Sequence, residues 1–464
     1  MKIKPPKQIG DMLYAIGSSI YRVSGPEGGL CAYLVETSAG LVQVNTVPEL
    51  FKTYFPHLRK LPVAVCMTAP VVSQLGDTLT GFEFELWQSR FLDFSNPHRV
   101  KFIGHESHIQ MLYKRLELTM NGDFIPDEQG VAQAQFVSRR WVDDVFEWMP
   151  GTGEVALGNH VSIDVSDPTS VRIFDKGKLL FDSAMYPVTL DRDGATLYVD
   201  SLISQIDPLV FNPDELGIIV AGAGIGSKPG VTSNFLLHYA DRLIWIDPPA
   251  RFYEKAAHLK VNPDQVTDFI ISHCHEDHIE GFSALLQRKI EHKQPLRLLS
   301  TPAIYDQLKS IFDPLFGNIA PHIEFSDLHD RSQFESYHGC NIDIRDNYHP
   351  VPTIGFKLTY NGKVVGISGD TIYSKRVLDA RLKNGSIDQA AYERLSPQWY
   401  ADTKFFFHDT TLNNDPVHTS LQNVEQFAGE ISQAKPYSYH FHLEPHLAFP
   451  SSRITPAVFG DRIA

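Results

Sequence analysis

The segment 272–278 reads Ser-His-Cys-His-Glu-Asp-His and places three imidazoles and the carboxylate of Asp277 within six positions. These side chains cannot all lie unpaired in a core, because a buried imidazole needs a hydrogen-bond partner and an unpaired buried carboxylate is costly. A divalent metal ion would satisfy all four at once, since histidine and aspartate are common metal ligands. The segment therefore predicts a metal site.

The spacing within this segment indicates two sets of ligands. An apolar stretch precedes it and predicts a strand, and His273 and His275 alternate along the extended chain that follows, so their rings point the same way. Asp277 and His278 come where the apolar periodicity of residues 281–286 predicts a helix. One strand end would then present ligands to two neighbouring points. A chance cluster is the weaker alternative, because the chain has only 20 histidines in 464 residues.

This His-x-His-x-Asp-His pattern resembles the metallo-β-lactamase superfamily, whose α/β fold is an αββα sandwich of two sheets between helices. Residues 347–356, Asn-Tyr-His-Pro-Val-Pro-Thr-Ile-Gly-Phe, resemble its third motif in the phosphodiesterase branch and imply His349 as a further ligand of the first metal. Residues 368–371, Ser-Gly-Asp-Thr, follow an apolar stretch where members place an aspartate that bridges two metals, here Asp370. The ligands implied to this point are His273, His275, Asp277, His278, His349 and Asp370.

The last ligand comes from residues 437–442, Tyr-Ser-Tyr-His-Phe-His. Ribonuclease Z and its relatives end the corresponding strand in His-Phe-Ser, which favours His440 as the ligand and puts His442 in place of the serine. Both histidines would lie on one face of the strand, so His442 stays open as the alternative. Asp247 ends another apolar stretch and resembles the superfamily carboxylate that orients ligand histidines without touching metal.

A second pair of motifs bears on proton transfer. Residues 408–411, His-Asp-Thr-Thr, and 418–420, His-Thr-Ser, resemble the His-Glu-Ala-Thr and His-Ser-Thr motifs of ribonuclease Z, with Asp409 in place of the glutamate. The resemblance implies that Asp409 orients His418, which donates a proton to the leaving oxygen. An Asp/His pair suits this role because it fixes the tautomer of the acid. A structural role for His418 is the alternative. Asp277 completes the expected catalytic set.

The resemblance implies a dinuclear metal-dependent hydrolase. Two divalent ions roughly 3.5 to 4 Å apart would lower the pKa of a bridging water toward about 7 and hold phosphoryl oxygens during in-line attack. Zinc suits the ligands, and manganese or iron would also be accepted. A redox di-iron site would be expected to have glutamate at position 275. The motifs also resemble enzymes that accompany cyclic-nucleotide-binding domains, which implies a cyclic nucleotide or related diester. A thioester or lactam hydrolase, and a metal-binding sensor or scaffold, are the alternatives.

The first two hundred residues repeat the pattern of strands without the histidines. Residues 33–45 align without gaps on residues 235–247, and the stretch 63–68 follows at almost the same interval as the apolar stretch that precedes His273. Residues 69–81 contain no histidine. We therefore expect residues 1–206 to be a degenerate copy of the fold without a metal site, and residues 207–464 to be the catalytic domain. The alternative is that any two α/β segments share such patterns. A fused inactive half could act as a built-in partner, and both a homodimer and a monomeric pseudo-dimer are open.

Composition and charge bear on substrate and compartment. A formal net charge of −14 would repel polyanions, so nucleic acid is disfavoured and a small phosphodiester is the expected substrate. No apolar run reaches the length of a membrane span, and the first residues lack the apolar core of a signal peptide. The four cysteines form no metal-type pair, which fits a reducing compartment. We expect a cytoplasmic protein without a membrane partner.

Overall fold

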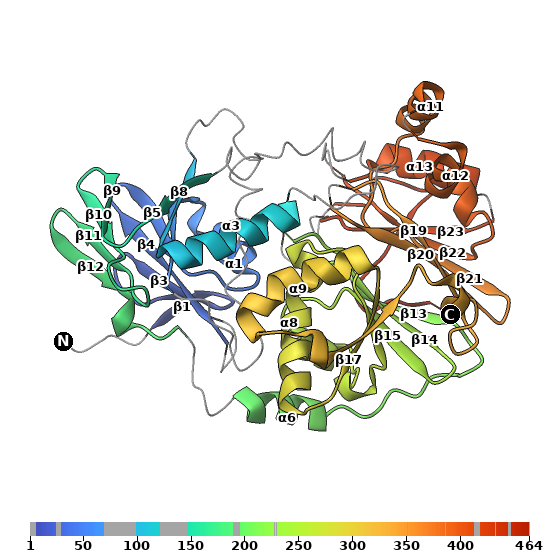
Figure 1. The fold of residues 1–464 in the computed structure, drawn as a ribbon, viewed down its shortest axis with the longest axis horizontal. Helices are drawn as coiled ribbons and strands as arrows, with labels where there is room; N and C mark the ends of the chain where they lie inside the picture. Colours follow the sequence, from blue (N-terminus) through green and yellow to red (C-terminus); the bar gives the residue numbers. More distant parts are fainter. Residues whose placement is uncertain are drawn as a thin grey trace.

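The computed structural model describes residues 6–24, 29–68, 99–120, 146–188, 195–226, 228, 230–349, 351–385, 387–412, 418–431, 433–443 and 447–463. Their strands form four sheets, two in each half of the chain, and Figure 1 shows the two halves side by side. Within the described residues, no helix is both long enough and apolar enough to cross a bilayer.

The C-terminal half contains a sheet of seven strands and a sheet of six. The first has the order β18 (Ile323–Asp327), β17 (Leu296–Ser300), β16 (Asp268–Ile270), β15 (Arg242–Ile246), β14 (Asn234–Tyr239), β13 (Gly217–Gly222) and β25 (Arg462–Ile463). The second has the order β19 (Asn341–Asp346), β20 (Ile354–Tyr360), β21 (Lys363–Ile367), β22 (Phe405–Asp409), β23 (Lys435–Tyr439) and β24 (Thr455–Pro456).

Helices cover the outer faces of these two sheets. The helices α7 (Phe252–His258), α8 (Glu276–Glu291) and α9 (Pro302–Phe316) share a core with the seven-stranded sheet and with strands of the other sheet. The helices α11 (Lys375–Asn384), α12 (Gln389–Leu395) and α13 (Leu421–Glu430) pack in a separate core against the six-stranded sheet. The predicted α/β sandwich is therefore confirmed in this half.

The direction of the central strands decides where polar side chains can gather. Strands β15 to β18 run parallel, as do β21 to β23, and the buried strand β13 is apolar on both faces, as expected in a sheet covered on both sides. In open α/β sheets, ligands bind beyond the carboxyl ends of the strands. The loops that follow β16, β21, β22 and β23 carry the predicted site residues.

The N-terminal half also contains two sheets. The larger has the order β1 (Lys7–Gly10), β2 (Leu13–Ala15), β3 (Ile20–Ser24), β4 (Cys31–Thr37), β5 (Gly40–Val44), β6 (Pro62–Met67), β7 (Val100–Gly104) and β8 (Phe146–Pro150). The smaller is antiparallel and contains β9 (Glu154–Gly158), β10 (Val161–Asp164), β11 (Arg172–Asp175) and β12 (Lys178–Asp182). The helices α1 (Leu50–Leu58) and α3 (Glu106–Met120) pack on the larger sheet.

The two halves repeat the same run of strands. Strands β4 and β5 are antiparallel and β5 to β8 are parallel, which is the order and direction of β14 to β18. The turns after β5 and β15 also match: Asn45 (φ 61°) and Asp247 (φ 54°) are both left-handed. Asn45 Oδ1 accepts from the backbone N–H and hydroxyl of Thr68, as the Asp247 carboxylate does from Ser272. The N-terminal half thus keeps the turn conformation and the hydrogen-bond pattern that surround Asp247 in the C-terminal half.

The ligand-free stretch 69–81 lies outside the described residues, so the loss of a metal site there stays a prediction. The division at residue 206 stays a prediction as well. Helix α6 (Ala195–Ser204) precedes it in the chain and packs against α7, and its residues Val199 and Ile203 join the core of the C-terminal half.

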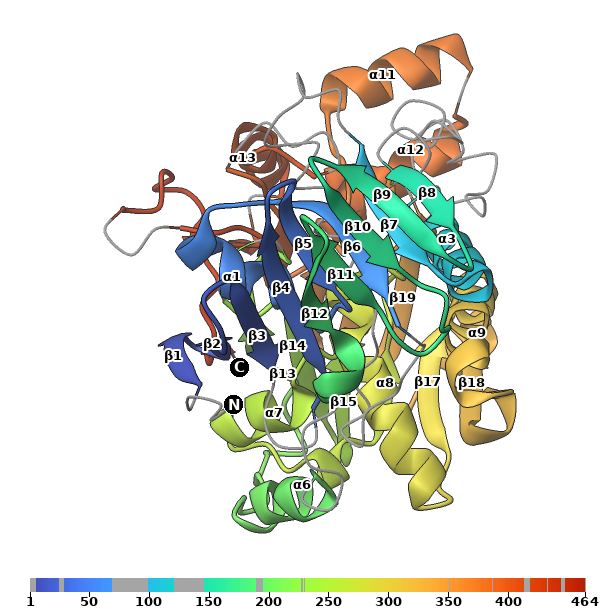
Figure 2. The same cartoon turned by 90° about the vertical axis from the view of Figure 1, so that its left-hand side faces the viewer.

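The halves meet through equivalent helices. Helix α3 lies beside α9 in both views of the molecule (Figure 1, Figure 2), and each of these helices follows the third strand of its parallel run. Near α1, Glu49 Oε1 accepts from Lys52 Nζ at 3.1 Å and from Lys255 Nζ of α7 at 2.9 Å. Burial opposes ionisation of Glu49, but the two lysines outweigh it and lower its pKa from 4.5 to about 2.

We expect Glu49→Gln to destabilise the protein at neutral pH by roughly 1.5–3 kcal/mol, the range for a hydrogen bond to a charged group. Because the folded-state pKa is depressed, this stabilisation is present above the unfolded pKa and is lost as pH falls toward about 2. The free energies of unfolding of wild type and Glu49→Gln, measured in urea, should therefore approach each other between about pH 6 and about pH 3. Glu36→Gln, at an exposed pair with Lys60, is the matched control and should change little. A gap that stays constant with pH would contradict the prediction.

Candidate metal centre

Seven buried side chains converge beyond the strand ends of the C-terminal half. His273 and His275 lie in the loop after β16, and Asp277 and His278 lie in the first turn of α8. The remaining residues follow β19, β21 and β23. The seven residues are His273, His275, Asp277, His278, His349, Asp370 and His440, each at most 6% exposed. Their ligand atoms form groups in which all atoms lie within 4.8 Å of one another.

The first group consists of His273, His275 and His349. The centre of the His273 ring lies 4.6 Å from the centre of the His275 ring and 5.1 Å from that of the His349 ring. His349 Nε2 lies 3.2 Å from His275 Nδ1. Three imidazoles that turn their nitrogens to one point, with no carboxylate in the group, are what a divalent ion of intermediate softness prefers.

The second group consists of Asp277, His278 and His440. His278 Nε2 lies 3.7 Å from Asp277 Oδ1, and His440 Nε2 lies 3.6 Å from Asp277 Oδ2. His442 belongs to none of the candidate groups found among the described residues, although it is only two positions away. The geometry thus brings His440 into the cluster, and its role as a ligand stays a prediction.

Asp370 lies between the two groups. Its Oδ2 is 3.8 Å from His273 Nε2 in the first group, and 3.3 Å from His278 Nε2 and 3.4 Å from His440 Nε2 in the second. Asp370 is therefore near both groups, and its role as a shared ligand stays a prediction.

The donor atoms fit a divalent metal. The buried atoms of this cluster that make no hydrogen bond include His273 Nε2, His278 Nε2, Asp370 Oδ1 and His440 Nδ1. An unsatisfied buried polar atom costs about 1–3 kcal/mol, and more when it is charged, so such a cluster is expensive unless something binds it. Imidazole and carboxylate together suit zinc, manganese or iron.

Asp247 orients the second group from outside. It accepts hydrogen bonds from the Ser272 backbone N–H at 2.7 Å and from the Ser272 hydroxyl at 2.6 Å, and its Oδ2 lies 2.8 Å from His278 Nδ1. A carboxylate at Nδ1 keeps the proton on that nitrogen and leaves Nε2 facing the cluster. The position of Asp247 agrees with the role that the resemblance implied.

Burial and neighbouring charges shift the pKa values of the clustered histidines in opposite directions. Burial and the neighbouring imidazoles lower the pKa of His273 and His349 well below the ordinary value, and burial lowers that of His275 to about 3. Burial also acts on His278, but Asp370, Asp277 and Asp247 raise its pKa well above the ordinary value. The lowered pKa values of the first group favour neutral imidazoles, which is the form that binds metal.

Asp409 and His418 form the predicted pair beside this cluster. Asp409 ends β22, and its two carboxylate oxygens lie 3.0 and 3.2 Å from His418 Nδ1. Asp409 also accepts from the Thr371 backbone N–H at 2.9 Å. Burial raises the pKa of Asp409, although His418 works against it. His418 Nδ1 is 3.8 Å from Asp370 Oδ2, so the pair lies at the edge of the metal cluster.

Sequence reasoning missed the residue that holds the Asp370 loop. Asn347 Nδ2 donates to the backbone carbonyls of Ser368 at 2.7 Å and Asp370 at 2.9 Å, across a left-handed Gly369 (φ 64°). A Cβ at position 369 would lie 2.2 Å from the carbonyl oxygen of Ile354, so only glycine fits. The motif of residues 347–356 includes Asn347, but no side-chain pattern indicates which backbone carbonyls it binds.

Cys274, which lies between two of these histidines in the chain, belongs to none of the candidate groups among the described residues. It is fully buried, and its Sγ lies 3.7 Å from the Ile304 carbonyl oxygen in α9.

The sequence matches one protein family and two characterised relatives. The sequence profile of the family described as "Anti-Pycsar protein Apyc1" matches residues 216–448, half of the chain. The cGMP-dependent 3',5'-cGMP phosphodiesterase A of Dictyostelium discoideum is 24% identical over 258 residues, which are 53% of this chain and 28% of that protein. The cAMP/cGMP-dependent 3',5'-cAMP/cGMP phosphodiesterase B of the same organism is 24% identical over 221 residues, 45% of this chain and 19% of that protein. The chain thus spans less than a third of either relative.

Two solved structures also match about half of the chain. The metallo-β-lactamase fold protein YhfI from Bacillus subtilis is 17% identical with a TM-score of 0.42, and the match covers 54% of this chain and all of that one. A diphosphatase of the PhnP family is 17% identical with a TM-score of 0.40, over 54% of this chain and 98% of that one.

Proposed function

The chain belongs to the family of the anti-Pycsar protein Apyc1, and on this premise we propose that it is a metal-dependent phosphodiesterase that acts on a small cyclic nucleotide or a related phosphodiester. The observation that carries this proposal is the position of Asp370 between two ligand groups, with the Asp409 and His418 pair at their edge. The names of the two Dictyostelium relatives support a cyclic-nucleotide substrate.

The chain's own residues would divide the work as follows. His273, His275 and His349 would hold one divalent ion, Asp277, His278 and His440 would hold a second, and Asp370 would be available to both groups. Such ions supply Lewis acidity, which lowers the pKa of a water and polarises a phosphoryl oxygen. The buried Asp247 keeps His278 in the tautomer that binds metal.

His418 is the proton donor to the leaving oxygen. Asp409 binds its Nδ1, so Nε2 is the nitrogen that exchanges a proton with substrate. Ring opening of a cyclic nucleotide expels a ribose alkoxide, which is a poor leaving group unless it is protonated. A thioester or a lactam hydrolase of this fold could use the same ligands and would have less need of this pair.

The charge of the protein supports a small substrate. A formal net charge of −14 disfavours the many phosphate contacts that a nucleic acid would make. A single phosphodiester needs only local positive charge, which the metal ions supply.

The test is turnover of a panel of substrates by the purified protein loaded with Zn²⁺ or Mn²⁺. Cyclic nucleotides should be opened to nucleoside monophosphates, detected by chromatography, and bis-p-nitrophenyl phosphate should release p-nitrophenolate. Cleavage of thioesters or lactams without any diester cleavage would overturn the proposal in favour of the alternative hydrolase. Metal binding without turnover of any of these would favour a sensor or scaffold.

A further inference from the structure

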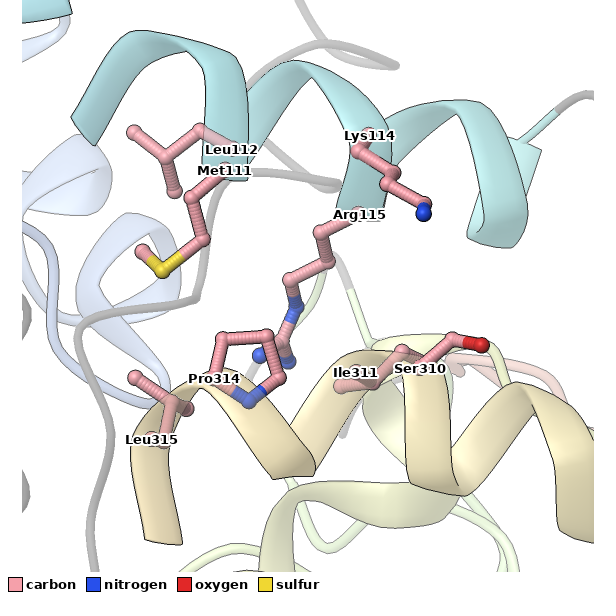
Figure 3. A pocket seen from close by; sticks show the side chains of 8 residues that line it. All are labelled: Met111, Leu112, Lys114, Arg115, Ser310, Ile311, Pro314 and Leu315. Atoms are coloured by element: carbon pink, nitrogen blue, oxygen red, sulfur yellow. The ribbon is translucent and has the colours of Figure 1, made fainter. Parts of the chain in front are cut away.

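A buried arginine of the N-terminal half reaches the helix that carries two of the proposed ligands. Arg115 lies on α3 and is 7% exposed, and its Nη2 is 3.8 Å from Oε1 of Glu276, which is 1% exposed. The Arg115 guanidinium also lies 5.7 Å from the centre of the Phe312 ring in α9. Figure 3 shows its side chain extending from α3 toward α9.

The contact between the two helices is itself specific. The buried Gln307 of α9 donates from Nε2 to the carbonyl oxygen of Leu118, near the end of α3, at 3.0 Å. This hydrogen bond fixes α3 along the axis of α9. Arg115 is one helical turn earlier on α3, so its reach toward α8 is set by the packing of the two halves.

Glu276 occupies a sensitive position. It is the first residue of α8 and lies between His275 and Asp277 in the chain. The helix begins with His275 as its N-cap, and that side chain makes no capping hydrogen bond, so the first turn depends on other contacts for its position. A shift of Glu276 would move His275 and Asp277 with it, one from each ligand group.

The electrostatics require a cation at this point. A buried carboxylate next to Asp277 in the chain is costly unless a positive charge compensates it, and removing one partner of a buried pair strands the other. Arg115 brings such a charge from a part of the chain 161 positions away. The N-terminal half contributes it, although no metal-ligand group among the described residues includes a residue of that half.

We propose that Arg115 is a positioning residue that the N-terminal half supplies to the metal centre, and that it acts through Glu276. This inference rests on one part of the proposed function, namely that the loops of the C-terminal half bind metal. It gives the N-terminal half a role other than holding substrate: without that half, the first turn of α8 loses the charge that fixes it.

The test uses the full chain and four variants: Arg115→Met, Glu276→Gln, the double variant, and Lys114→Met. A pocket of about 50 Å³ borders Arg115 between Met111, Leu112, Pro314 and Leu315 (Figure 3), so a methionine of similar length can replace it without overpacking. Lys114 is exposed on the same helix and is the matched control. The measured quantity is the dissociation constant for Zn²⁺, by competition with a chromophoric chelator.

Each single variant should weaken Zn²⁺ binding at least about ten-fold, because each removes one partner of the buried ion pair at the first turn of α8. The double variant should bind more tightly than the product of the single effects requires, since it leaves neither charge behind. Lys114→Met should match wild type. Zn²⁺ binding by Arg115→Met within about two-fold of wild type, or single effects that simply multiply, would overturn the inference.

Two further results keep the test decisive. If Arg115→Met shows no cooperative unfolding transition, Arg115→Lys takes its place and should recover most of the wild-type affinity, and failure to do so counts against the inference. If wild type binds no Zn²⁺ or other divalent ion, the proposed function fails and the inference with it. Tight binding by wild type together with an unaffected Arg115 variant removes the inference alone.

Discussion

Asp370→Ala should reduce metal binding from two ions per chain to one or none and lower phosphodiester turnover by roughly 1,000-fold. The physical reason is position: Asp370 Oδ2 is within 3.8 Å of nitrogens from both ligand groups, so its loss affects both. The loss should therefore appear directly in the number of metal ions bound per chain.

The measurement is metal content by mass spectrometry after gel filtration, together with turnover of bis-p-nitrophenyl phosphate. Asp241→Ala is the matched control, because that aspartate is 78% exposed and belongs to none of the candidate metal-ligand groups among the described residues. An Asp370→Ala variant with two metal ions and wild-type turnover would contradict the assignment of Asp370 as the shared ligand.

His418→Ala should lower turnover of a cyclic nucleotide by about 100- to 10,000-fold, the usual contribution of a general acid, while metal content stays at the wild-type level. The effect should depend on the leaving group. Since p-nitrophenolate leaves without a proton, turnover of bis-p-nitrophenyl phosphate should fall much less than that of the cyclic nucleotide. Asp409→Asn should act in the same direction, because it changes the hydrogen-bond partner that fixes the His418 tautomer.

Two results would contradict this role. An equal loss on both substrates would mean that His418 does not protonate the leaving group. Loss of metal in His418→Ala would make it a ligand instead, which the group of Asp370, His418 and His440 leaves geometrically open. The comparison of leaving groups therefore separates acid catalysis from metal binding.

The local part of the site could be predicted from the sequence. Four of the converging residues lie within six positions, so strand and helix periodicity alone places them together. The repeat of residues 33–45 was visible for the same reason, since a strand, a turn and a second strand are a local unit. Strand β22 and the loop to His418 were located by their motif, and the structure brings Asp409 and His418 to hydrogen-bonding distance. The roles of all these residues as ligands or acids stay predictions.

The long-range part could not be predicted. Asn347 binds backbone carbonyls 21 and 23 positions away, and a backbone carbonyl has no signature in the side-chain pattern. The contact between Arg115 and Glu276 crosses the two halves, and charge alone does not distinguish a buried arginine from a surface one. The antiparallel sheet β9 to β12 also went unpredicted, because the alignment of the two copies ended before it.

The most direct test of the central claim is phosphodiester turnover by the same protein sample before chelation, after chelation, and after Zn²⁺ or Mn²⁺ is added back. The ligand geometry predicts that chelation abolishes turnover and that about two equivalents of metal restore it. The fold should survive chelation, because two apolar cores of the C-terminal half do not depend on the ligands. Undiminished diester cleavage by fully metal-stripped, folded protein would contradict the account.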